Sequence, residues 1–188
     1  FGLKMLGRAE TAVRGNLVSA LGMLIAVVAT LLYQGMSYQW ILVGVLIGGT
    51  IGLVAALRVP MTSMPEFVAL FNGTGGIASL FVGWAEYARH YGEYQGNPEL
   101  SLISIIATYL AILIGGVTFT GSIIAYAKLA GRIGSKPVLY SGQQVVNALM
   151  LVAALICGAV FVMNPDAALA QMLFYAALAV SLILGVLV

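Results

Sequence analysis

Long uninterrupted apolar runs dominate the chain, and short polar or turn-forming segments separate them. A helix that crosses the hydrocarbon core of a bilayer needs about 20 mostly apolar residues. The apolar positions are continuous rather than alternating at every second residue, which excludes a membrane β-barrel. The pattern predicts an all-α, polytopic transmembrane helix bundle. Six full spans are expected at residues 17–33, 40–57, 65–85, 102–127, 145–163 and 167–188, with residues 1–6 as the tail of a helix lying upstream.

Composition supports a membrane protein and narrows its chemistry. Hydrophobic residues make up 62% of the 188 residues and charged residues only 7%, whereas soluble domains carry about a quarter charged residues. The single cysteine, Cys157, excludes an internal disulfide and a cysteine-based metal cluster, and we expect no metal and no nucleic-acid partner. Phe1 and Val188 suggest a fragment of a longer chain, so residues 1–188 are expected to form one transmembrane domain of a larger protein.

The basic residues are distributed unequally between the two faces that six crossings define. One face, called side one, holds seven of the eight, and the opposite face, side two, holds only Arg89, together with the single histidine, His90. The positive-inside rule makes side one cytoplasmic. We therefore expect a multi-pass protein of the cell inner (plasma) membrane with both chain ends cytoplasmic. The side-one residues are Lys4, Arg8, Arg14, Arg58, Lys128, Arg132 and Lys136.

Small residues recur at helical spacing in two of the spans. Residues Gly44, Gly48 and Gly52 lie four apart in one span, and Gly75, Ser79 and Gly83 lie four apart in the next. This spacing favours close packing of helix backbones inside a bilayer. Residues 73–78 formally fit a dinucleotide-binding fingerprint, but that motif needs a preceding strand. We therefore expect no nucleotide or other cofactor to bind to this segment.

Three polar residues inside the spans are candidates for function, because polar groups are costly in a membrane. Asn72 lies about 10 Å inward from Pro65 and Ser122 about 9 Å inward from Lys128, both measured from side one. Thr118 shares the face of Ser122. The matched depth fits either a narrow wet path or an interhelical hydrogen bond, which is worth about 0.6 kcal/mol. Because Asn and Ser do not titrate at neutral pH, proton movement here would need ordered water or an ionisable group from another chain.

Two segments resemble proton-translocating NAD(P) transhydrogenases. Residues 61–72 are similar to the family's M-T-x-M-P-x-x-V-A segment, and residues 115–122 are similar to its G-x-V-T-F-T-G-S segment. Ser135-Lys136-Pro137, followed by Asn147-Ala148-Leu149, fits the loop and helix start that come next. The order and spacing agree over nearly the whole chain, and the match is to the transmembrane domain of the beta subunit or to the equivalent part of a fused chain.

The resemblance implies that this segment couples proton translocation to hydride transfer between NAD(H) and NADP(H) in attached soluble domains. In relatives, a polar residue at the Asn72 position, often His, and the serine at the Ser122 position are associated with the proton path. Since Asn72 does not titrate, we expect the relay residue to come from the alpha-subunit transmembrane helices. The implied partners also include the NAD-binding domain, the NADP-binding domain of the same parent chain, the lipid bilayer and, as a homodimer, a second copy of the complex.

Four charged residues near side one are candidates for contact with the NADP-binding domain, or they serve only to set the topology. They are Arg58, Glu66, Lys128 and Arg132. Two other functions stay open from the residues alone, a small-solute transporter or channel and a structural membrane subunit of a respiratory complex. Transporters commonly show inverted repeats, and we find no clear repeat within the six spans.

Overall fold

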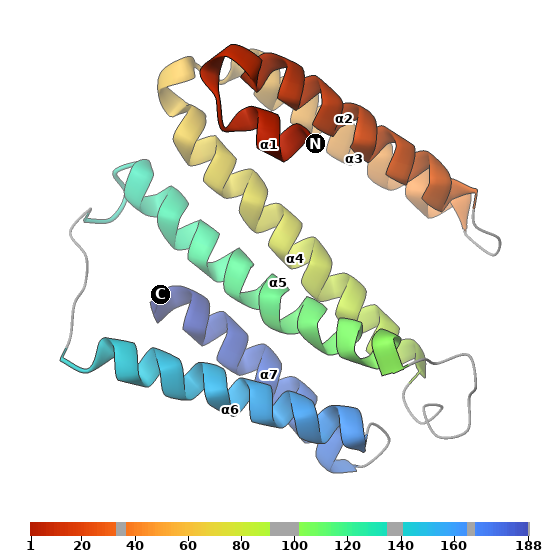
Figure 1. The fold of residues 1–188 in the computed structure, drawn as a ribbon, viewed down its shortest axis with the longest axis vertical. Coiled ribbons are helices and arrows are strands. Elements are labelled where there is room, and N and C mark those ends of the chain that lie inside the picture. The colour runs from red at the N-terminus through yellow and green to blue at the C-terminus, as the bar shows by residue number, and fades with distance from the viewer. Residues whose placement is uncertain (33–36, 91–101, 135–140, 165–167, 188) are drawn as a thin grey trace. The chain divides into compact units, whose positions relative to one another are not determined.

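The computed structural model describes residues 1–32, 37–90, 102–134, 141–164 and 168–187, and these are built from helices (Figure 1). Within these ranges, six helices are long and apolar enough to cross a membrane, which confirms the predicted all-α transmembrane fold. The helices are α1 (Gly2–Leu6), α2 (Ala9–Leu31), α3 (Tyr38–Arg58), the 3-10 turn η1 (Met61–Ser63), α4 (Met64–His90), α5 (Leu102–Leu129), α6 (Gln143–Met163) and α7 (Ala168–Leu187).

The helices extend beyond the apolar runs that predicted them. Helix α2 begins at Ala9 rather than at residue 17, and its first turns carry Glu10 and Arg14. Helix α4 continues past residue 85 to His90. The apolar run marks only the part of a helix that hydrocarbon surrounds, whereas backbone hydrogen bonding continues into the polar boundary. Lys136 and the start of the last predicted span lie outside the described residues.

The chain separates into two compact units, unit 1 (Phe1–Arg58) and unit 2 (Val59–Val188). In unit 1 the five-residue helix α1 packs back against α2. A Cβ on Gly15 would lie 3.0 Å from the Gly2 carbonyl oxygen, and the Thr11 hydroxyl donates to the Met5 carbonyl over 2.6 Å. No residue of α3 is buried among the described residues of the chain. The single domain expected over residues 1–188 stays a prediction.

Unit 2 is organised around α5, which packs against α4, α7 and α6. Helices α4 and α5 run side by side in opposite directions (Figure 1). Two close glycine contacts hold this pair together. A Cβ on Gly115 would lie only 2.7 Å from both the Gly76 carbonyl oxygen and the Leu80 nitrogen, and a Cβ on Gly83 would lie 3.0 Å from the Thr108 carbonyl oxygen. The two backbones therefore touch, as small residues permit inside a bilayer.

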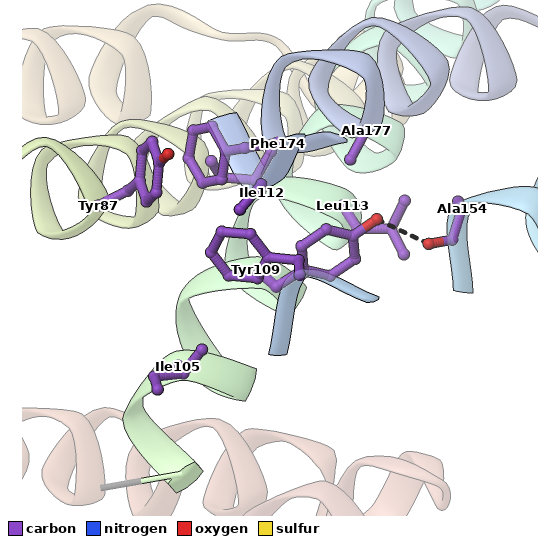
Figure 2. Packing of buried hydrophobic residues seen from close by; sticks show 10 residues of the cluster. Tyr87, Ile105, Tyr109, Ile112, Leu113, Ala154, Phe174 and Ala177 are labelled. Atoms are coloured by element: carbon purple, nitrogen blue, oxygen red, sulfur yellow. Dashed lines mark hydrogen bonds between the residues drawn. The ribbon is translucent and has the colours of Figure 1, made fainter. Parts of the chain in front are cut away.

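An aromatic cluster fills the part of unit 2 near the C-terminal end of α4. The Tyr87 ring stacks on Phe174 of α7 with 3.9 Å between centroids, and Phe161 of α6 lies 5.7 Å from Tyr87. Tyr109 of α5 donates its hydroxyl to the Ala154 carbonyl over 2.6 Å (Figure 2). This hydrogen bond satisfies a phenol that would otherwise be unpaired in an apolar core. The cluster joins all four long helices of unit 2.

The glycines on the predicted packing faces behave differently from one another. Gly83 lies in the α4–α5 contact, but a Cβ on Gly75 would meet no described atom within 4 Å. Within unit 2 the contact is made at Gly76, one position further along, because the buried face of α4 is turned away from Gly75. A Cβ on any of the four α3 glycines would also meet none of the described atoms within 4 Å. These are the predicted packing residues Gly44, Gly48 and Gly52, and Gly49.

Candidate functional site

Asn72 of α4 and Ser122 of α5 are joined by a hydrogen bond. The Asn72 amide nitrogen Nδ2 donates to the Ser122 Oγ over 2.8 Å. Ser122 is 7% exposed, whereas Asn72 is an exposed residue of this chain. The structure thus brings together the two polar residues that the sequence places at the same depth.

The position of this pair follows from helix geometry and from one glycine. Asn72 lies eight residues after Met64, about 12 Å along α4, and Ser122 lies seven residues before Leu129, about 10 Å along α5. Because the helices are antiparallel, these depths coincide. A Cβ on Gly73 would lie 3.1 Å from the Ser122 Cβ. The glycine next to Asn72 therefore lets α5 come near enough for the hydrogen bond.

Thr118 lies in the same contact, one turn from Ser122. A Cβ placed on Gly76 would lie 2.9 Å from the Thr118 Cβ. Thr118 therefore packs against the α4 backbone, and its predicted part in a wet path stays a prediction.

The α4–α5 contact leaves no room for water at its centre, since the Gly76 and Gly115 backbones touch. The space lies instead along the outer edge of the contact, on the exposed side of α4. Asn72 lies there, with Gly75 beside it and Ser79 two turns further on, where the Ser79 Oγ donates to the Ala111 carbonyl over 3.4 Å. We call Asn72, Gly75 and Ser79 the outer edge of α4.

The charged residues of unit 2 that are described lie at the two ends of its helices. Glu66 is half-buried in the first turn of α4, and Lys128 and Arg132 lie at the end of α5, with the Arg132 guanidinium 5.6 Å from the Tyr126 ring centre. Arg58 ends α3 and belongs to unit 1. In the described residues, no group of three or more His, Cys, Asp and Glu side chains suited to a metal is found.

Two features of the site were missed by sequence reasoning. One is the contact register on α4, where adjacent glycines at 75 and 76 gave no signal of which one meets α5. The other is an ion pair at the opposite end of α4, where the His90 Nε2 lies 3.3 Å from the Glu86 Oε1. The i, i+4 spacing of these two residues was the available signal.

Comparison with known proteins identifies the family. A family model described as NAD(P) transhydrogenase beta subunit matches residues 1–188. The chain belongs to the NAD(P) transhydrogenase beta subunit family. Two sequences from Rhodospirillum rubrum, one of them from a named strain, carry the name NAD(P) transhydrogenase subunit beta. Each is 38% identical to this chain over 145 residues, which cover 75% of this chain and 31% of the relative.

The chain spans about a third of the length of these relatives. Together with its six membrane-spanning helices, family membership makes it a multi-pass membrane protein. The resemblance expected from residues 61–72 and 115–122 is thereby confirmed.

Proposed function

We propose that this chain is the proton-conducting membrane part of an NAD(P) transhydrogenase. In this proposal it couples proton translocation to hydride transfer between NAD(H) and NADP(H), which bind to soluble domains of the complete enzyme and not to this segment. Family membership supports the reaction. The observation that carries the role of this segment is the Asn72–Ser122 hydrogen bond at the outer edge of α4, inside two membrane-spanning helices.

The pair is suited to hold water in a fixed orientation. The Ser122 Oγ accepts from Asn72, so its own hydroxyl hydrogen is available to donate. Asn72 still has a carbonyl oxygen that accepts and a second amide hydrogen that donates. Since Asn72 is exposed in this chain, these groups point toward whatever covers α4. A water chain along the outer edge, completed by an ionisable side chain of the alpha-subunit helices, would carry the proton.

The end of unit 2 at the start of α4 and the end of α5 is the proposed coupling end. Glu66, Lys128 and Arg132 lie there, and the NADP-binding domain of the parent chain would contact them. Arg58 belongs to unit 1 and is a separate candidate for contact with that domain. This end is cytoplasmic in the proposed topology, and the complete enzyme is a homodimer in the inner membrane. Nucleotide state would bias the direction in which the water chain opens, and the proton gradient would bias nucleotide binding equally.

The test measures two quantities in the complete enzyme in sealed vesicles, namely proton uptake with a pH-sensitive dye and hydride transfer between nucleotides. The substitution Asn72→Leu removes the amide while keeping a side chain of similar size. We expect the Asn72→Leu enzyme to lose proton uptake. We expect it also to lose hydride transfer under conditions in which hydride transfer is coupled to proton uptake. Asn72→His, which keeps a polar group, should retain both.

Thr74→Val is the matched control. Thr74 lies two residues from Asn72 on another face of α4, and its hydroxyl donates to the Phe71 carbonyl of its own helix over 2.7 Å. This variant should behave as the parent enzyme. Unchanged proton uptake in Asn72→Leu would refute the proposal and favour a structural membrane subunit. Solute uptake without any nucleotide dependence would instead favour a transporter.

A further inference from the structure

The ion pair of His90 and Glu86 lies at the end of α4 opposite to the coupling end. The His90 Nε2 is 3.3 Å from the Glu86 Oε1, with the side chains 17% and 36% exposed. Histidine changes its charge between about pH 5 and 8, and a carboxylate within hydrogen-bond reach gives it a partner for proton exchange. An i, i+4 pair at a helix end also has an ordinary, small stabilising role. Geometry along α4 distinguishes this pair from an ordinary one.

Glu86 and His90 lie on the same helix row as the outer edge of α4. Asn72, Ser79 and Glu86 are seven residues apart, and seven residues make two turns with a drift of only about 20°. His90 follows one turn later and returns to the direction of Asn72. The row runs about 21 Å from Asn72 to Glu86. The proposed water path and the ion pair therefore share one face of one helix.

Close packing between α4 and α5 excludes water from the space between them and leaves this row as the route for a water path. Contacts of Gly76 with Gly115, and of Gly83 with Thr108, close the space between the helices along the same stretch. On this helix pair, a water path from Asn72 toward side two would therefore follow the outer edge of α4, past Ser79 and toward Glu86 and His90.

We infer that Glu86 and His90 form the proton-exchange site at the side-two mouth of the path. The inference rests on the function proposed above. A proton taken up from water on side two by either group passes across the Nε2–Oε1 contact and is released to the water beside Ser79. The pair then returns to its starting protonation state, so that one proton has moved and nothing else has changed. The same proton transfers in the opposite direction release a proton to the water on side two.

Few other charged groups of unit 2 lie near this pair, as far as the structure describes them. On α4, Arg89 is adjacent to His90 in sequence, about 100° from His90 and about 60° from Glu86 around the helix, and it is exposed. Helices α6 and α7 carry no charged residue within their described bounds, and α5 carries only Lys128, at its far end. Among these groups, His90 is the single histidine, the side-chain type that exchanges protons near neutral pH.

The experiment uses the complete enzyme in sealed vesicles with the pH of each side set independently. His90→Gln removes the titratable group and keeps a side chain that donates to Glu86. We expect the coupled rate to lose its dependence on side-two pH between about 5 and 8, while its dependence on side-one pH is kept. The coupled rate should fall about a hundredfold, the lower range for a positioned acid–base group. Glu86→Gln should likewise lose the dependence of the coupled rate on side-two pH and keep the dependence on side-one pH.

Arg89→Gln is the matched control, since it removes a charge from the same helix end without removing either member of the His90–Glu86 contact. It should keep the side-two pH dependence of the parent enzyme. An unchanged side-two profile in both His90→Gln and Glu86→Gln would overturn the inference, and so would a loss that affected both sides equally. The proposed function is tested by a different variant, and it fails if the Asn72→Leu enzyme still takes up protons. A merely structural pair would change thermal stability without changing the sided profile.

Discussion

Glycines of α5 in unit 2 and of α3 in unit 1 have opposite surroundings. In unit 2, a Cβ on Gly115 would strike the α4 backbone at 2.7 Å. In unit 1, Cβ atoms on Gly44, Gly48 and Gly52 would meet nothing within 4 Å among the described residues. Glycine therefore permits close helix packing within the chain at Gly115, and not on the α3 face. The predicted packing role of the α3 glycines stays a prediction.

The same contrast explains where a polar path lies. Where glycines bring two backbones into contact, the space between the helices closes and water is excluded. The polar residues Asn72 and Ser79 lie at the margin of that closed contact, beside Gly75, which has open space. Close packing thus fixes the two helices while leaving a polar edge on the outside of α4.

The largest expected effect comes from filling the α4–α5 contact. Gly115→Leu places a branched side chain where even a Cβ has no room. Overpacking costs about 1–3 kcal/mol and more where backbone lies opposite. We expect little or no folded complex, measured as yield and as thermal unfolding of the purified enzyme. A stable Gly115→Leu protein would show that the two helices do not touch as described.

The next effect compares aromatic residues in the two units. Phe174 is fully buried, whereas Trp40 of α3 is 73% exposed. Phe174→Ala should destabilise the enzyme by about 3 kcal/mol, because it leaves a cavity among several aromatic rings. Trp40→Ala should lower stability far less. Equal losses in thermal unfolding would mean that α3 is packed as tightly as unit 2.

A smaller effect is expected from the tyrosine hydroxyl in the same cluster. Tyr109→Phe keeps the ring and removes the donor to the Ala154 carbonyl. Hydrogen bonds within membrane proteins average about 0.6 kcal/mol and reach about 1.7 kcal/mol, and this short buried one should contribute about 1 kcal/mol. Denaturant titration of the purified enzyme measures the loss. No loss would indicate that the hydroxyl contributes nothing to the α5–α6 contact.

The smallest effect is expected at the open α3 glycines. Gly48→Leu should change the stability of the chain by no more than about 0.5 kcal/mol, as for other substitutions away from packed features. The informative measurement is subunit assembly, followed by size-exclusion chromatography. If α3 packs against another subunit, assembly weakens while the chain remains folded. A chain that unfolds would show that Gly48 is packed within the chain itself.

The sequence predicted the spans and the matched depth of Asn72 and Ser122 for simple physical reasons. Hydrocarbon thickness fixes span length, and a constant rise per residue fixes the depth of a residue on antiparallel helices. The contact register was not predictable, because Gly75 and Gly76 are both small and only the partner helix selects between them. The aromatic cluster was not predictable either. Its rings come from four helices, and their meeting depends on packing that no local pattern encodes.

The most direct measurement of the central claim is water access to the outer edge of α4. Cys157 is the chain's single cysteine, so Cys157→Ala permits single-cysteine labelling once other cysteines of the complete enzyme are replaced. Gly75→Cys lies beside Asn72, while Phe81→Cys lies about 180° from Asn72 around the same helix. The account predicts that a small charged thiol reagent modifies Gly75→Cys and leaves Phe81→Cys unmodified. An unreactive Gly75→Cys, or equal labelling at both positions, would contradict it.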